Sequence, residues 1–342
     1  MIFGVLTVFA IISFTKTRRM NALWHDGSWD PSWDTWWHYK EGVMGGPSHW
    51  GQTAFMAIAS DVWPACYQGK MQSPISISTK HLLYDPNLVP LKISGSDKQI
   101  DVEVVNTGQD LQVKILDSTA SVVFSEGPLV YNYKFFGALI KFGSRSDRGS
   151  DHRIDGIAFP AELQLYAFNF ILYQNFSNAL SKPNGLAVLS VLFKIGDQSS
   201  ADLEALLSTA EQVQLKGQSK RLHGLLLDAV LPSTMQYITY QGSLPFPACY
   251  ETATWILLNQ PIVITETQLK SLRQLRIAPF RGSGSMADNY RTIQKLNNRS
   301  VRTNIDFKKS LRIVKAFTSP RKTRKSIDNI QLKIKLTITI TS

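Results

Sequence analysis

The chain has 342 residues, of which 44% are hydrophobic, so it can form a sizeable core and is not disordered as a whole. Its formal net charge of +11 is unevenly distributed, because eleven lysine and arginine residues follow position 300 against only two aspartates. The preceding 300 residues therefore carry a net charge of only about +2. This balance excludes a globally basic surface, and we expect no nucleic-acid partner.

The N-terminus is an apolar run of about fourteen residues, MIFGVLTVFAIISF, followed by three basic residues. A membrane-spanning helix needs ~20 apolar residues, so we expect no transmembrane anchor. The run has the length of a signal-peptide core, although it lacks a basic n-region and a small-x-small cleavage site. A buried first strand is the alternative. We favour a signal peptide over residues 1–19 and a secreted, extracellular protein.

Residues 20–35 begin a tryptophan-rich segment. Clustered tryptophans can bind carbohydrate, but we favour an aromatic cluster that docks this segment onto the following domain. The tryptophans between positions 20 and 50 are Trp24, Trp29, Trp33, Trp36, Trp37 and Trp50.

Residues 72–307 are interpreted as one large domain, because no linker or repeat interrupts them, and the resemblance described below extends this domain to residues 36–307. Short apolar or alternating runs, broken by Gly, Pro, Asn and Asp, predict strands over most of this region. Helices are predicted only at 199–213 and 265–276, where leucines recur at helical spacing. The predicted strands include 102–106, 111–116, 121–125, 133–142, 187–196, 236–240 and 253–258.

Residues 308–342 form a basic C-terminal tail. Its first part, KKSLRIVKAFTSPRKTRKS, is most simply solvated and charged, and an electrostatic contact with acidic glycans or lipid head groups is the functional alternative. Its last part, IQLKIKLTITI, alternates in a pattern that favours a strand at a sheet edge, or it is a poorly defined chain end. The sequence leaves both choices open.

Local motifs point to no catalytic chemistry. The six histidines show none of the close spacings that bind zinc, and no nucleophile elbow or phosphate-binding loop occurs. The two cysteines, Cys66 and Cys249, are compatible with free thiols or with a disulfide. Asn175 and Asn298 begin Asn-x-Ser triplets that could carry glycans in an extracellular protein.

Longer stretches resemble the α-class carbonic anhydrases in the expected order, from about Trp36 to Phe307. The resemblance implies a mainly β domain with a large, mostly antiparallel twisted sheet and a few short helices. WWHYKEG and PACYETATW are most similar to the secreted carbonic anhydrase-related proteins, ten and eleven. The stretches that carry the resemblance are QSPISIS (72–78), YDP (84–86), GSDHRIDGIAFPAELQLYAFN (149–169), PNGLAVLSVLFKIG (183–196), YQGSLPFPACYETATWILL (240–258) and DNYRTIQKLNNR (288–299).

Active members of that family hold zinc through three histidines. Two of them, at i and i+2, share one face of a strand, and the third lies on the neighbouring strand. The zinc lowers the pKa of its bound water to ~7, so that hydroxide is available to attack carbon dioxide. In this sequence the three positions are Leu139, Lys141 and Gln164, none of which is a histidine. We therefore expect no metal, no other cofactor and no carbonic anhydrase activity.

The resemblance assigns the family's accessory positions too, and most are altered. The proton-shuttle histidine falls on Lys80, the hydroxide-orienting threonine on Pro245, and the glutamate that holds this threonine on Asp151. Glu162 keeps a carboxylate that would orient a metal ligand, and His152 nearby is expected to be structural. The remaining vestigial pocket positions are Tyr166, Val188, Leu244, Phe246 and Trp255.

Lys141 is the unusual residue of the predicted strand 133–142. By the resemblance, its face opens onto the floor of a cleft. We expect its ammonium to replace the missing cation and to reach Glu162, Asp151 or trapped water.

The resemblance further implies a Cys66–Cys249 disulfide and an extracellular binding role. We expect a catalytically silent ligand of a cell-surface or synaptic receptor, neurexin-like or contactin-like. No cysteine follows Cys249, so a disulfide-linked attachment to neurexin is in doubt. The alternatives are weak residual hydratase or esterase activity, and binding of acidic glycans through the tail.

Overall fold

The computed structural model describes residues 37–51, 63–116 and 121–307. The predicted signal peptide, most of the tryptophan-rich segment and the basic tail lie outside these residues. Within the described ranges, no helix combines the length and the apolar character that crossing a membrane would require.

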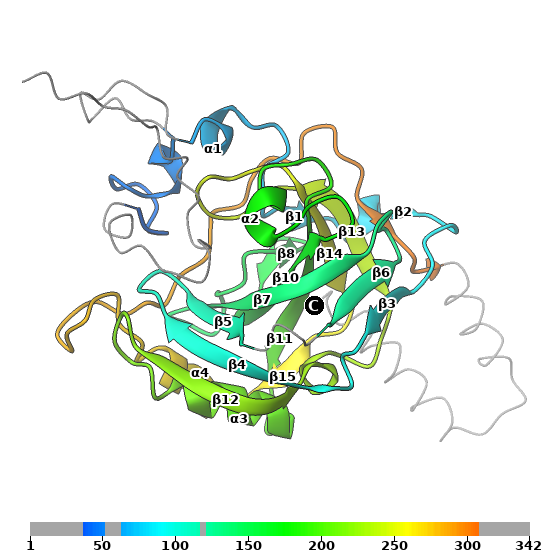
Figure 1. Cartoon of the computed structure of the whole chain (residues 1–342). Helices are drawn as coiled ribbons and strands as arrows, with labels where there is room; N and C mark the ends of the chain where they lie inside the picture. The colour runs from blue at the N-terminus through cyan, green and yellow to red at the C-terminus, as the bar shows by residue number, and fades with distance from the viewer. Residues whose placement is uncertain (1–36, 52–62, 117–120, 308–342) are drawn as a thin grey trace, which may run out of the picture.

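One sheet of thirteen strands dominates the domain (Figure 1). Its main path runs β12-β4-β5-β7-β10-β11-β14-β13-β16-β2, while β3, β6 and β15 pair at its sides. The strands are β2 (Leu83–Tyr84), β3 (Leu91–Ser94), β4 (Gln99–Asn106), β5 (Leu111–Ile115), β6 (Val123–Glu126), β7 (Tyr133–Phe142), β10 (Ala161–Asn169), β11 (Leu186–Ile195), β12 (Ser219–Leu226), β13 (Tyr237–Gly242), β14 (Ala253–Leu258), β15 (Ile262–Ile264) and β16 (Arg302–Thr303).

Most strand pairs are antiparallel; β11 pairs in parallel with β14 and β15, and β16 with β2. The predicted single, mainly β domain with a mostly antiparallel sheet is confirmed. A second, small sheet contains β1 (Ser76–Ile77), β8 (Arg153–Ile154) and β9 (Ile157–Ala158). The helices are α1 (Ala65–Gln68), α2 (Phe176–Ala179), α3 (Ala201–Ala210) and α4 (Glu266–Leu272), with the 3-10 turns η2 (Pro47–His49), η3 (Thr79–His81) and η4 (Leu227–Val230).

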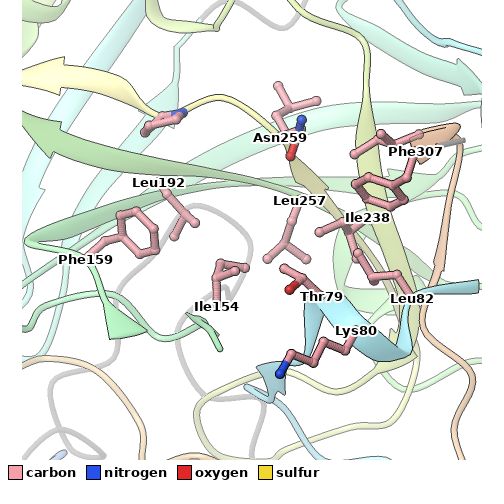
Figure 2. Close-up of a pocket in the computed structure, with 13 residues that line it drawn as sticks. Thr79, Lys80, Leu82, Ile154, Phe159, Leu192, Ile238, Leu257, Asn259 and Phe307 are labelled. Atoms are coloured by element: carbon pink, nitrogen blue, oxygen red, sulfur yellow. The ribbon is translucent and has the colours of Figure 1, made fainter. Parts of the chain in front are cut away.

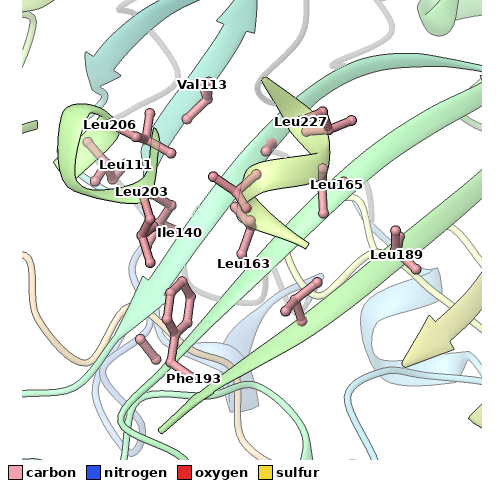
Figure 3. Packing of buried hydrophobic residues seen from close by; sticks show 14 of the residues in the cluster. Leu111, Val113, Ile140, Leu163, Leu165, Leu189, Phe193, Leu203, Leu206 and Leu227 are labelled. Carbon is pink, nitrogen blue, oxygen red and sulfur yellow. The ribbon is translucent and has the colours of Figure 1, made fainter. Parts of the chain in front are cut away.

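Both predicted helices form, and they are shorter than the leucine pattern suggested. The Ser200 side chain caps α3 by accepting from the Leu203 N–H, and α4 starts at a capping box between Thr265 and Gln268. Their leucines cover one face of the sheet. Figure 3 shows Leu203 of α3 beside Ile140 of β7 in this aliphatic core.

The opposite face of the same strands carries a second, more aromatic core. Leu139, Tyr166 and Val188 contribute to it from β7, β10 and β11, while Ile140, Leu163 and Leu189 point to the aliphatic side. This separation follows from the strand geometry, since successive side chains point to opposite faces. Because both faces are covered, β10 is buried along its whole length.

The disulfide implied by the resemblance is present. Cys66 in α1 is bonded to Cys249, with the two Cα atoms 5.0 Å apart and a sequence separation of 183. It ties the short helix near the N-terminus of the domain to the loop after β13, and the described residues contain no free cysteine.

Candidate functional site

The three positions that would hold zinc lie together at the centre of the sheet. Leu139 of β7 lies opposite Gln164 of β10, and Lys141 lies opposite Glu162 in the same antiparallel pair. Their side chains point to the aromatic face, and all four residues are fully buried. The expectation that this face opens onto a cleft is therefore wrong for these positions, because Tyr39 packs against Lys141 while Tyr166 and Phe246 pack beside Gln164.

The ammonium of Lys141 is held by a carboxylate and a phenol. Its Nζ lies 2.6 Å from Oδ1 of Asp110 and 2.7 Å from the hydroxyl of Tyr39, which in turn donates to Oδ2 of Asp110 at 2.9 Å. The same Nζ lies 4.4 Å from the centre of the Tyr39 ring. Burial and the Asp110 charge keep the pKa of Tyr39 well above its usual value, so the phenol stays neutral.

These contacts correct the expected partner of Lys141. Asp110 immediately precedes β5, and Leu111 of β5 pairs with Ile140 of β7, so the Asp110 carboxylate lies beside the Lys141 side chain. Glu162 lies directly across from Lys141 but is engaged by His152. The lysine therefore satisfies its charge on the β5 side of the strand.

Glu162 belongs to a second buried network. Its Oε1 lies 2.8 Å from Nδ1 of His152, and its Oε2 accepts from the His152 backbone N–H at 2.9 Å. Nε2 of His152 lies 2.7 Å from the hydroxyl of Tyr240, and the ring packs against Trp255 with 4.6 Å between centroids. His152 therefore joins β10 to β13 and β14, as a structural residue would.

Gln164 has no free donor or acceptor to offer a metal. Its Nε2 donates to Asp151 at 2.7 Å and to Glu162 at 3.0 Å. Its Oε1 accepts from the Tyr166 hydroxyl at 2.8 Å. Tyr166 is itself fully buried next to Phe246, with 6.0 Å between ring centroids. Other predicted pocket residues, also buried, are Val188, Leu244, Pro245 and Trp255.

Asp151 accepts hydrogen bonds from Gln164 and from the Arg291 backbone N–H, yet burial raises its pKa to about 6. The folded protein therefore retains a proton on Asp151 between pH 4 and 6, where an unfolded chain has lost it. Protonated Asp151 therefore contributes to the free energy of unfolding below pH 4. This contribution, at most about 3 kcal/mol, is lost as the pH rises through 6.

We expect Asp151→Asn to remove this part of the pH dependence. Between pH 4 and 7, the wild-type free energy of unfolding should fall relative to that of the variant, measured by urea titration at each pH. The quantity to compare is how the difference in the free energy of unfolding between the two proteins changes with pH. Its absolute value is less informative, because the substitution also changes two hydrogen bonds. Parallel pH profiles for the two proteins would contradict the raised pKa.

Gln112 of β5 is a further polar residue of this site. It lies directly opposite Leu139, is fully buried, and its amide nitrogen and oxygen have no hydrogen-bond partner among the described residues. An unpaired buried polar group costs ~1–3 kcal/mol, so Gln112 is a source of instability opposite Leu139.

Gln112→Met is expected to stabilise the protein by about 1 kcal/mol, because a similar volume is filled without an unpaired amide. Chemical denaturation measures this change. Asn106→Leu is the matched control: the Asn106 amide is equally buried but donates to Val213, Gln214 and Arg276, so its loss should destabilise. If the two variants lost stability equally, Gln112 would have a partner in solution.

Lys80 lies apart from this buried group. It is exposed, belongs to η3 and lines an apolar pocket with Leu192 and Leu257. Asn175 and Asn298, the predicted glycan acceptors, are also exposed, and Oδ1 of Asn175 caps α2 by accepting from the Asn178 N–H.

The donors at this site do not fit a zinc ion. Leu139 has no atom that can coordinate a metal, and the Lys141 ammonium is ion-paired with Asp110. The Gln164 amide makes all its hydrogen bonds to neighbouring side chains. Within the described ranges, no cluster of three or more His, Cys, Asp or Glu side chains could hold a metal.

Comparison with known proteins gives the family. The family model of the eukaryotic-type carbonic anhydrases matches residues 45–305. Over 268 residues, the chain is 38% identical to "Putative carbonic anhydrase-like protein 2" of Caenorhabditis elegans, an alignment that covers 76% of this chain and 77% of the relative. Together with the sheet and its central strands, these matches show that the chain belongs to the eukaryotic-type carbonic anhydrase family.

Proposed function

We propose that this chain is a catalytically silent member of the family, similar to the secreted related proteins ten and eleven. The observation that carries the proposal is that Leu139 and Lys141 stand at the two strand-histidine positions, with the Lys141 ammonium ion-paired to Asp110. A zinc-bound hydroxide needs three ligands and an open fourth position, and this strand pair offers neither. Pro245 moreover has no hydroxyl to orient a nucleophile.

The purified full chain is expected to bind no stoichiometric zinc and to hydrate carbon dioxide no faster than buffer. Elemental analysis measures the zinc content and stopped-flow hydration measures the activity of the same sample, with an active carbonic anhydrase as the assay control. Activity that follows bound zinc and disappears with a chelator would refute catalytic silence. Esterase activity above buffer without metal would support residual enzymology instead.

The proposed role is binding of another protein outside the cell. The Cys66–Cys249 disulfide supports secretion, because such bonds persist mainly in oxidising compartments. Exposed acceptors at Asn175 and Asn298 are compatible with N-glycans, which a glycosidase-sensitive mass of the secreted protein would reveal.

The partner we propose is a neurexin-like or contactin-like receptor. No cysteine follows Cys249, so the complex would be non-covalent. The test is retention of the secreted chain on cells that display such ectodomains, with cells lacking them as the control. Retention on neither receptor class would leave this role unsupported even if the chain proved inactive and secreted.

A second candidate is binding of acidic glycans through residues 308–325, which the concentration of basic residues in the tail favours. Truncation after Phe307 should then abolish salt-sensitive retention on heparin. Unchanged retention would refute this role.

A further inference from the structure

An apolar pocket opens on the aromatic side of the sheet, separate from the buried Lys141 group. Its cavity volume is about 240 Å³, and its walls include Ile154, Leu192, Ile238 and Leu257. These four side chains are buried in the fold. Figure 2 shows Leu192, Ile154 and Leu257 around the hollow and Phe307 beside Ile238 at its rim.

The pocket suits apolar side chains better than a polar ligand. A cavity of ~150 Å³ lined by aliphatic and aromatic residues can hold a benzene ring, so this one has room for more than one aliphatic side chain. Polar residues at its border are few, and the hydroxyl of Thr79 already donates to Asp155. Covering such a surface is favourable by ~25 cal/mol per Å².

The chain itself supplies an occupant. Phe307, the last described residue, lines the pocket and is 43% exposed, so the chain leaves the domain at the pocket mouth. Leu311, Ile313 and Val314 are the first large apolar residues after it. An extended chain spans ~3.3–3.6 Å per residue, so the four residues from Phe307 to Leu311 can reach ~13 Å from the pocket lining. A short tether also gives an effective concentration in the millimolar range.

We propose that residues 308–317 fold back onto the domain and insert Leu311 with Ile313 or Val314 into this pocket. The insertion fixes the first basic residues of the tail, from Lys308 to Lys315, against the body of the protein. The later basic cluster, residues 321–325, stays accessible. The tail is thus divided into a docked part and a free part.

Limited trypsin digestion of the full chain, followed by mass spectrometry, tests the proposal. Cleavage after Lys308 is compared with cleavage in residues 321–325 of the same molecule. In the triple variant Leu311→Ser, Ile313→Ser, Val314→Ser, cleavage after Lys308 should be about tenfold faster than in wild type, because proteolysis follows the population of the open form. The net charge and the residues flanking that bond are unchanged.

Two further variants make the outcome decisive. Leu82→Trp, at a partly buried residue of the pocket wall, should fill the cavity and expose the Lys308 bond to the same extent. The matched control Ile330→Ser, Leu332→Ser, Ile334→Ser removes three apolar residues from the later tail and should leave the Lys308 bond protected.

Equal cleavage in wild type and in the first triple variant would overturn the proposal. Exposure by the control variant instead would assign the pocket to the last segment of the chain. A small apolar molecule that copurifies with the full chain and is displaced in Leu82→Trp would assign it to an external ligand.

Discussion

Replacing Lys141 with methionine is expected to destabilise the protein by about 3–5 kcal/mol, because the substitution leaves the Asp110 carboxylate buried without its counter-charge. Both partners are fully buried, and the 2.6 Å contact is supplemented by the Tyr39 hydroxyl. Solvent therefore cannot take over the role of the ammonium. The free energy of unfolding, from urea or guanidinium titration with the slope checked for each protein, measures the loss.

Two companion variants separate the ion pair from a general effect of losing a lysine. Lys92→Met removes an exposed lysine that lies 3.9 Å from Glu126, and it should change stability by less than about 1 kcal/mol. Lys141→Met combined with Asp110→Asn removes both charges while keeping an acceptor for Tyr39, and it should recover most of the loss. A single variant as stable as wild type would mean that Asp110 is protonated or hydrated without Lys141.

Lys141 stands at one of the three positions where active members of the family hold zinc, and its ion pair with Asp110 offers no equivalent chemistry. A lysine ammonium has no lone pair for a water-activating role, and here its protons point to Asp110 and Tyr39. The two charges neutralise each other, so no net positive charge remains to lower the pKa of a water molecule. The ion pair therefore offers no electrophile at this position.

Much of the fold followed from patterns along the chain. Alternating runs located the central strands, and leucine spacing located α3 and α4, because these signals depend only on neighbours in sequence. Leu139, Lys141 and Gln164 were assigned to the zinc-ligand positions by resemblance, and in the structure they lie on the neighbouring strands β7 and β10.

The partner of Lys141 could not be predicted in the same way. Glu162, Asp151 or trapped water were the expected partners, because the resemblance places Lys141 on the floor of a cleft with these two carboxylates. Asp110 contacts Lys141 because β5 lies beside β7, on the side away from β10. Tyr39 belongs to a segment about 100 residues earlier in the sequence. Contacts of this kind depend on strand order, which periodicity does not encode. The only local signal was the aspartate directly before the strand 111–116.

The burial of the site was missed for a related reason. The sequence placed Tyr166 and Phe246 among the pocket positions one by one. Their combined effect depends on packing: Tyr166 donates to Gln164 and lies next to Phe246, and Leu139, Lys141 and Gln164 are all fully buried. Whether several large side chains pack over one site depends on the three-dimensional fold, whereas the sequence shows only which large side chains are present.

Removing the disulfide is the second change with a large expected effect. Cys66→Ser with Cys249→Ser frees a loop of 183 residues in the unfolded chain, for which loop-closure entropy gives about 5 kcal/mol as an upper value. We expect a loss of about 2–5 kcal/mol, because measured effects usually fall below the entropic value. Thermal and denaturant unfolding of the double variant, beside wild type with and without reductant, provide the measurement.

The backbone around both cysteines has other ties, which predict how the variant behaves. The Gln72 amide donates to the Cys249 carbonyl at 3.1 Å, and the Arg291 guanidinium donates to the Cys66 carbonyl at 3.2 Å. These bonds should hold the native geometry once folded, so the variant should keep a native-like near-UV spectrum at low temperature while unfolding more readily. If the variant were as stable as wild type in both thermal and denaturant unfolding, the crosslink would not restrict the unfolded chain. If the variant lost the native near-UV spectrum, the crosslink would be needed for folding itself.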